Sequence, residues 1–196
     1  MLQKSLRPAV TNLITPLCKA LIKIGVTADL VTLLGSLGSC LSAIYFFARG
    51  EFFIGTLIVT LFVLSDLLDG TIARLSNAGG TRWGALMDST LDRLTDSIIV
   101  ISLVMYFRTR DEVVSILLLI VLVTGFLISY IRARAEALGM DCSVGFAERT
   151  ERLIILLVGT GLYGLGLSFA LSAALWTLVG ASLLTIAQRM LAVRKR

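Results

Sequence analysis

Long apolar runs are the feature that most constrains what this chain can fold into. Several runs reach about 20 residues, the length that an α-helix needs to cross a hydrocarbon layer roughly 30 Å thick. Hydrophobic residues make up 57% of the chain, charged residues only 16%, and the mean hydropathy is +0.92. A soluble domain carries roughly 25% charged residues. The sequence therefore predicts an all-α integral membrane protein.

Six transmembrane helices are predicted from the apolar runs and the polar residues between them. The predicted ranges are 29–49, 52–75, 82–106, 112–136, 147–168 and 171–195. Residues 1–25 place apolar side chains at helical spacing among lysines, which predicts an amphipathic helix lying in the membrane interface. Because there is no linker or low-complexity stretch, residues 1–196 are interpreted as a single membrane domain, with the six-helix bundle over 29–195.

The basic residues are distributed unevenly between the two ends of these spans. Of the 18 lysines and arginines, only Arg49, Arg108 and Arg110 fall on one side. The positive-inside rule then places both chain ends in the cytoplasm, as an even number of spans requires. This bias accounts for most of the net charge of +5, so a nucleic-acid partner is not expected.

Histidine is absent from the sequence, and the three cysteines are far apart. The chain therefore has no imidazole general base, no Ser-His-Asp triad and no His-ligated zinc. Any acid–base or metal chemistry must use aspartate and glutamate.

Four carboxylates lie inside the apolar spans, where a charged side chain costs at least about 2.5–3.5 kcal/mol and is by default a functional candidate. Asp66 and Asp69 are three residues apart, and Asp88 and Asp92 are four apart, so each pair shares one helix face. The short loop between the two helices makes them antiparallel neighbours. Both pairs are therefore expected to converge near the cytoplasmic side.

Four carboxylates at close range repel one another unless a cation neutralises them. Oxygen ligands without cysteine or histidine favour Mg²⁺ or Mn²⁺, and a charge of −4 suggests two ions. Small residues lie between the acids: Gly70, Ala73 and Gly84, with Arg74 beside them. Alone they would indicate tight helix packing. Together with the acids, they indicate a bulky phosphate-bearing ligand that approaches the backbone.

The segment 66–92 resembles the signature of the CDP-alcohol phosphatidyltransferases at every defined position. The matching residues are Asp66-x-x-Asp69-Gly70-x-x-Ala73-Arg74 and, after nine intervening residues, Gly84-x-x-x-Asp88-x-x-x-Asp92. The predicted length and spans also fit, so the resemblance extends over nearly the whole chain. It implies a homodimer in the bacterial cell membrane, with the active site on the cytoplasmic side.

The resemblance also implies a role for each signature residue. Asp66, Asp69 and Asp88 bind metal at the diphosphate of CDP-diacylglycerol, and Asp92 lies near the metal and acts as the general base. The donor lipid is contacted by Asp66, Asp69, Gly70, Ala73, Arg74, Gly84 and Asp88. A further family stretch corresponds here to residues 28–32, where Asp29 and Thr32 are candidates for nucleotide contact. Asp29 is equally consistent with a helix N-cap.

Asp96 lies one helical turn beyond Asp92 and outside the signature. We expect it to pair with a polar group inside the bundle rather than to bind metal.

Arginines gather at the cytoplasmic level of the predicted fourth to sixth spans. Arg132, Arg149 and Arg152 lie close together in the sequence, and Arg189 joins them from the last span. This concentration favours a phosphorylated acceptor, because guanidinium groups bind phosphate bidentately. The alternative is a positive-inside bias balanced by Glu–Arg pairs. The segments 129–136 and 145–152 resemble the actinobacterial phosphatidylinositol-phosphate synthases of the family, which implies inositol phosphate as the acceptor. The resemblance also implies that Arg132, Arg152 and Arg189 bind the acceptor phosphate, with Arg149 as a further candidate.

Two other functions stay open. Glycerol 3-phosphate is the alternative acceptor, as in phosphatidylglycerophosphate synthases, although the Gly-Lys-x-Lys-Thr-like stretch associated with them is absent. A divalent-cation transporter would also carry intramembrane acids. An arginine beside the acidic site argues against a cation path.

Overall fold

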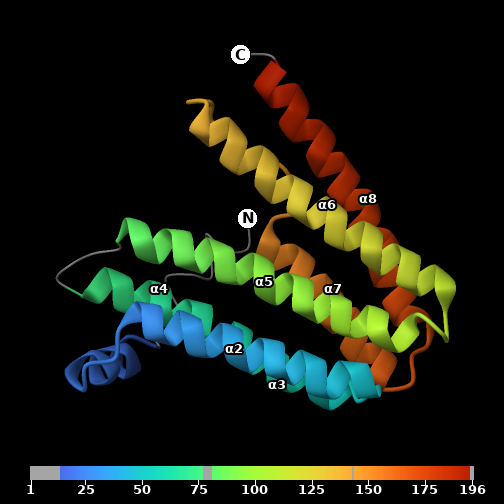
Figure 1. The fold of residues 1–196 in the computed structure, drawn as a ribbon, viewed down its shortest axis with the longest axis horizontal. Coiled ribbons are helices and arrows are strands. Elements are labelled where there is room, and N and C mark those ends of the chain that lie inside the picture. The colour runs from blue at the N-terminus through green and yellow to red at the C-terminus, as the bar shows by residue number, and fades with distance from the viewer. Residues whose placement is uncertain (1–13, 77–80, 143, 195–196) are drawn as a thin grey trace. The chain divides into compact units, whose positions relative to one another are not determined.

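The structure is a computed structural model that describes residues 14–76, 81–142 and 144–194. Within these ranges every regular element is a helix (Figure 1). Residues 14–23 are helical, and the elements that follow are α2 (Ala28–Phe46), the 3-10 turn η1 (Phe47–Arg49), α3 (Phe52–Val63), α4 (Ser65–Leu75), α5 (Arg82–Phe107), α6 (Glu112–Ala137), α7 (Arg149–Gly164) and α8 (Phe169–Arg194).

Short polar side chains cap the starts of three helices. The Thr27 hydroxyl accepts a hydrogen bond from the Leu30 amide at the start of α2, and Thr81 does the same for Gly84 at the start of α5. The Asp111 carboxylate caps α6. These bonds satisfy amides that the first helical turn leaves without a partner. The alternative interpretation of Asp29 as an N-cap is therefore wrong, because Thr27 fills that position and Asp29 lies inside the first turn.

Four segments are long and apolar enough to cross a membrane: Ala28–Arg49, Phe52–Leu75, Glu112–Ala137 and Phe169–Arg194. The predicted integral membrane class is thus supported by the described residues. The predicted six spans are only partly reproduced. Helix α5 is long enough but charged, and α7 has 16 residues. At 1.5 Å per residue, α7 is about 24 Å long, shorter than the hydrocarbon layer.

Two predicted spans differ in detail from the structure. The span predicted over 52–75 is interrupted at Leu64, which separates α3 from α4. The span predicted over 147–168 is helical only from Arg149 to Gly164, and Gly166 follows with a left-handed φ of 96°. The predicted interfacial helix is described only from residue 14 onward, because residues 1–13 lie outside the described ranges.

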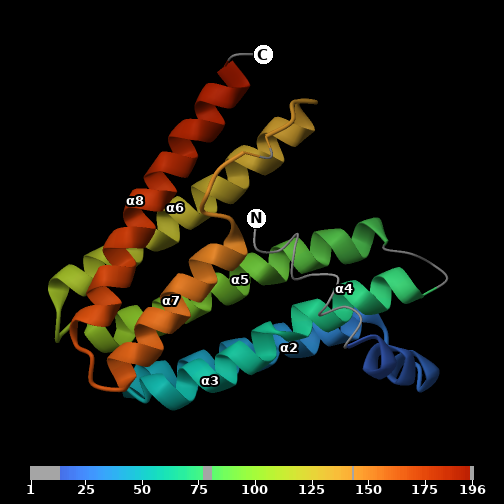
Figure 2. The ribbon, with the colours of Figure 1, turned by 180° about the vertical axis from the view of Figure 1, so that it is seen from behind.

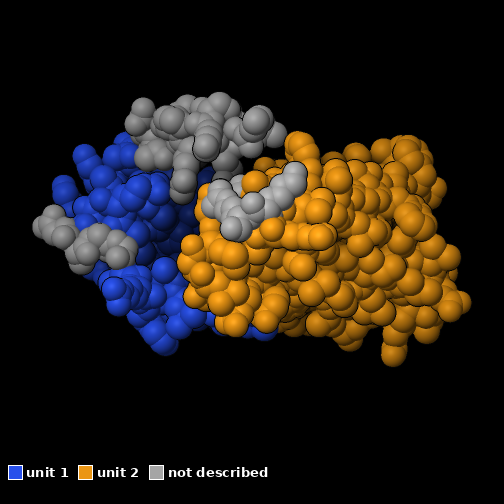
Figure 3. Space-filling view, turned by 90° about the horizontal axis from the view of Figure 1, so that it is seen from above, with its two compact units in different colours: residues 1–41, 58–95 blue, residues 42–57, 96–196 orange. Residues whose placement is uncertain are grey.

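The chain divides into two compact units (Figure 3). Unit 1 comprises residues 1–41 and 58–95, and unit 2 comprises residues 42–57 and 96–196.

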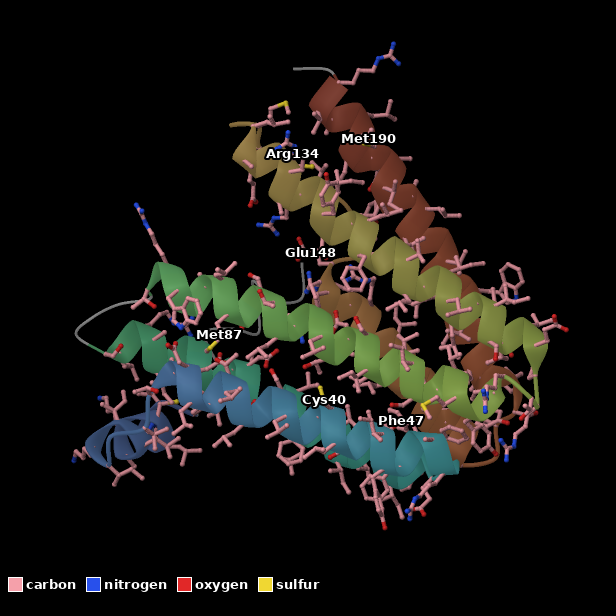
Figure 4. The ribbon with its side chains drawn as sticks, viewed as in Figure 1. Cys40, Phe47, Met87, Arg134, Glu148 and Met190 are labelled. Carbon is pink, nitrogen blue, oxygen red and sulfur yellow. The ribbon has the colours of Figure 1, made fainter. Side chains whose placement is uncertain are left out.

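Unit 1 holds the described N-terminal helix, most of α2, the second half of α3, α4 and the first half of α5. The helix over 14–23 contacts α4 through Cys18, whose thiol donates to the Leu68 carbonyl at 3.8 Å. Helix α2 contacts α5 through Cys40, labelled in Figure 4, whose thiol lies 3.8 Å from the Thr95 hydroxyl.

In unit 2, helix α8 packs against both α6 and α7, as the two opposite views in Figures 1 and 2 show. An aromatic cluster joins the remaining elements: Phe47, Phe52, Tyr106, Phe107 and Tyr163. Its rings come from η1 and from the ends of α3, α5 and α7, so they hold three helix ends together. Phe47, labelled in Figure 4, is completely buried.

The close approach of α7 to α3 in unit 2 depends on Gly164. A Cβ at this position would contact the Phe53 backbone nitrogen and lie 3.0 Å from the Phe52 Cβ. Because a backbone atom cannot rotate away, we expect Gly164→Ala to destabilise the protein by about 1–3 kcal/mol. Gly180→Ala is the matched control, since a Cβ there has nothing within 4 Å. Thermal unfolding of both variants in detergent should show a lower midpoint for Gly164→Ala alone. Equal midpoints would contradict this packing.

Candidate active site

The Asp69 side chain is the most enclosed of the four predicted metal-binding carboxylates. Asp69 lies on α4 and is only 7% exposed. The Thr32 hydroxyl on α2 donates to its Oδ2 at 2.6 Å. Asp66 and Asp88 are close enough to act on Asp69 electrostatically. The structure therefore brings α2, α4 and α5 of unit 1 together around one buried carboxylate.

Gly84 lies against the other predicted nucleotide-contacting residue, Asp29. A Cβ on Gly84 would lie 3.0 Å from the Asp29 Oδ1. The start of α2 and the start of α5 therefore meet inside unit 1. Glycine at this point leaves room beside the carboxylate, as the small residues of the signature predict.

Arg74 lies over Gly70 on α4. A Cβ on Gly70 would be 3.6 Å from the Arg74 Nη1, and the Arg74 Nη2 donates to the Thr71 hydroxyl at 3.0 Å. The Arg74 residue is exposed. Its guanidinium therefore lies along the helix face that carries Asp66 and Gly70, while remaining accessible to an anionic ligand.

Asp92 lies on α5, one turn beyond Asp88. Its Oδ2 is 3.6 Å from Arg93 Nη2, and its side chain is 15% exposed. The carboxylate is thus largely enclosed but still reaches the surface of unit 1, as a group that accepts a proton from a substrate must.

The carboxylates suit a hard divalent cation by their chemistry. Within residues 14–76, 81–142 and 144–194, no group of three or more histidine, cysteine, aspartate or glutamate side chains lies close enough together to hold a metal ion. Asp69 nevertheless lies in an apolar setting with Asp66 and Asp88 acting on it. Such an excess of negative charge favours a cation, and the oxygen donors fit Mg²⁺ or Mn²⁺.

Two of the predicted acceptor-binding arginines are deeply buried in unit 2. Arg189 on α8 is 2% exposed and Arg152 on α7 is 7% exposed. Arg189 donates to the carbonyls of Val144 and Ile128, the former at 2.9 Å, and Arg152 donates to the Ala147 carbonyl at 2.8 Å. Both arginines therefore hold the segment that leads from α6 into α7.

The two other predicted acceptor-binding arginines have carboxylate partners. Arg132 is exposed near the end of α6, and its Nε donates to Glu136 at 2.8 Å. It is close enough to Arg189 to act on it electrostatically. Arg149 donates from Nε to Asp96 at 3.3 Å. This contact confirms the expectation that Asp96 pairs with a polar group of the bundle.

Cys18 is a residue near the site that sequence reasoning missed. It is completely buried, and its thiol donates to the carbonyl of Leu68, the residue before Asp69. Burial raises the pKa of the Cys18 thiol, and the charge of Arg74 lowers it by less. In the sequence, Cys18 is only a small residue on a predicted amphipathic helix. No sequence pattern indicates its contact with Leu68, which lies 50 residues further along the chain.

A buried aspartate site in an all-helical membrane protein, carrying the full eight-residue signature, defines a class of phosphotransferases. The chain belongs to the CDP-alcohol phosphatidyltransferase family, whose sequence model matches residues 25–187. Sequence and structure together therefore confirm the family resemblance.

Similar proteins within the family are phosphatidylinositol phosphate synthases. The enzyme of Streptomyces avermitilis is 42% identical over 205 residues, covering 100% of this chain and 83% of the relative. A crystal structure of the Mycobacterium tuberculosis enzyme with CDP-DAG bound is 43% identical, has a TM-score of 0.87, and covers 93% of this chain and 94% of that one. A structure of the same enzyme with manganese and citrate also has a TM-score of 0.87 and 43% identity, over 92% and 88% of the two chains.

The hydrogen bond between Thr32 and Asp69 gives a direct test of this site. Thr32→Val removes the hydroxyl donor from a buried carboxylate at nearly constant volume, and we expect a loss of about 1–3 kcal/mol of stability. Thr32→Ser keeps the hydroxyl and is the matched control. Thermal unfolding in detergent should separate the two variants. The same midpoint for both would show that the bond contributes nothing.

Proposed function

We propose that this protein transfers a phosphatidyl group from CDP-diacylglycerol to inositol phosphate, producing phosphatidylinositol phosphate and CMP. The observation that carries the proposal is the likeness to the CDP-DAG-bound synthase, at 43% identity over 93% of this chain. The buried arginines of unit 2 support a phosphorylated acceptor, because guanidinium groups match phosphate oxygens.

The donor lipid is held by the signature residues of unit 1. Asp66, Asp69, Asp88 and Asp92 hold Mg²⁺ or Mn²⁺, with two ions matching four carboxylates. When bound, the metal neutralises charge on the diphosphate and stabilises the leaving CMP. The manganese complex of the related synthase supports this assignment. The remaining contacts to CDP-diacylglycerol come from Asp29, Thr32, Gly70, Ala73, Arg74 and Gly84.

Asp92 is the general base of the reaction. Its carboxylate takes the proton from the acceptor hydroxyl, the oxygen attacks the lipid-side phosphorus, and the bond from that phosphorus to CMP breaks. Arg132, Arg152 and Arg189 bind the acceptor phosphate and so orient the hydroxyl. Orientation of this kind contributes several kcal/mol in enzymes that join two substrates.

The proposed membrane arrangement has six spans, with an amphipathic helix in the interface and both chain ends in the cytoplasm. The positive-inside distribution of Lys and Arg supports this orientation. We place the active site on the cytoplasmic side of the bacterial cell membrane, where CDP-activated lipid meets water-soluble inositol phosphate. The working form is a homodimer, as the family resemblance implies.

An acceptor panel tests the reaction and its substrate together. Purified protein with CDP-diacylglycerol and Mg²⁺ should release CMP on addition of inositol phosphate, with little release for inositol, serine or glycerol 3-phosphate. Release with glycerol 3-phosphate and none with inositol phosphate would move the assignment to phosphatidylglycerophosphate synthesis. Divalent-cation flux into proteoliposomes without CMP release would instead support a transporter.

Asp92→Asn tests the assigned base. General-base catalysis contributes about 10²–10⁴-fold to a rate, so kcat for CMP release should fall by that order. Asp111→Asn is the matched control, because Asn also caps a helix start and Asp111 only caps α6. Asp92→Asn activity within threefold of the control would refute the assignment.

Metal removal tests the role of the aspartates. Chelation with EDTA should abolish CMP release, and excess Mg²⁺ or Mn²⁺ should restore it, whereas Ca²⁺ should not, because its longer bonds and larger coordination number suit a different site. Full activity after exhaustive chelation would exclude a metal-dependent transfer.

A further inference from the structure

The ion pair between Asp96 and Arg149 lies close to the proposed catalytic residues on both of its helices. The Arg149 Nε donates to the Asp96 Oδ1 at 3.3 Å, and the two side chains are 21% and 24% exposed. Most of the surface of both groups is withdrawn from water. An enclosed ion pair of this kind restricts the relative positions of its two side chains, because separating the charges leaves each one poorly solvated.

Each partner of the ion pair lies one helical turn from a residue of the proposed site. On α5, Asp96 follows the assigned base Asp92 by four residues, which is one helical turn. On α7, Arg149 is the first residue, one turn before Arg152. Arg152 in turn holds the Ala147 carbonyl. The pair therefore joins the helix that carries the base to the helix that begins with the acceptor-binding segment.

Local electrostatics explain why a carboxylate is needed there. Arg149 places a positive charge in the first turn of α7, where the helix dipole is also positive. Glu151 supplies one carboxylate within this first turn, and Asp96 supplies a second one from α5 that contacts Arg149 directly. Glu148, the residue before α7 (Figure 4), makes no side-chain cap to the helix. A carboxylate brought from α5 thus stabilises the start of α7 and fixes its register against α5.

We propose that Asp96 and Arg149 act as a positioning pair that sets the start of α7, and with it the acceptor-binding Arg152, against the part of α5 that belongs to unit 2, and that Arg149 does not bind the acceptor phosphate. This inference rests on the proposed function, and it deepens the description of the same site. In this role neither residue binds substrate. Their effect on the reaction passes through Arg152, which lies one turn after Arg149 on α7.

A double-mutant cycle tests the pair. The variants are Asp96→Asn, Arg149→Gln and the double variant, with Arg149→Lys as the conservative substitution. Arg134→Gln is the matched control, because Arg134 is an exposed arginine near the end of α6. For each protein, kcat and KM for inositol phosphate, KM for CDP-diacylglycerol and the thermal midpoint are measured.

Both single variants should lower kcat/KM for inositol phosphate by the same factor, about 10-fold, since small misplacements of reacting groups are costly. The double variant should be no worse than either single one. Arg149→Lys should recover most of the loss, and KM for CDP-diacylglycerol should stay within twofold throughout. The control should match the unmodified protein.

Three outcomes would overturn the inference. The first is a raised acceptor KM in Arg149→Gln with none in Asp96→Asn, which would make Arg149 a phosphate ligand. The second is multiplication of the two effects in the double variant. The third is a fall in thermal midpoint with unchanged kinetics. The acceptor panel with the unmodified protein tests the proposed function separately from this inference. If the unmodified protein uses another phosphorylated acceptor, the proposed function is wrong. The double-mutant cycle is then measured with the acceptor that the protein does use.

Discussion

A buried carboxylate in an apolar bundle is the constraint on which the rest of this molecule depends. Asp69 is nearly inaccessible, and it has Asp66 and Asp88 in electrostatic range. A charge in this position is unfavourable unless hydrogen-bond donors or cations surround it. The Thr32 hydroxyl supplies one donor. The close approach of α2 and α4 brings this donor to the carboxylate.

The sequence predicts most of the fold because apolar periodicity and helix length carry the information. Each of the six predicted spans contains at least one observed helix. Where the prediction was imprecise, the cause lies in backbone geometry. Leu64 is apolar, so the interruption between α3 and α4 is invisible to hydropathy. Helix α7 ends at Gly164, and the left-handed Gly166 follows two residues later. Hydropathy does not reveal this end, because Leu165 and Leu167 beside these glycines are apolar.

The candidate site was predictable as a set of residues but not as a set of contacts. The aspartate signature names its proposed members, since acids inside apolar helices are functional candidates by default. The partner of Asp69 is Thr32, which lies 37 residues earlier in the chain, and no local pattern indicates that bond. Asp29 was misread as a possible cap because Thr27, two residues earlier, has the same capping ability. Arg149 was grouped with the other arginines by charge alone, whereas its carboxylate partner comes from a different helix.

The carbonyl contacts of Arg152 and Arg189 have a consequence for the entropy of binding. Long arginine side chains lose considerable rotamer freedom when a ligand orders them. Here the guanidinium groups already donate to Ala147, Val144 and Ile128. Their rotamers are therefore selected by the fold itself. If the acceptor phosphate binds there, as we propose, it meets guanidinium groups that are already oriented, and binding costs little additional rotamer entropy.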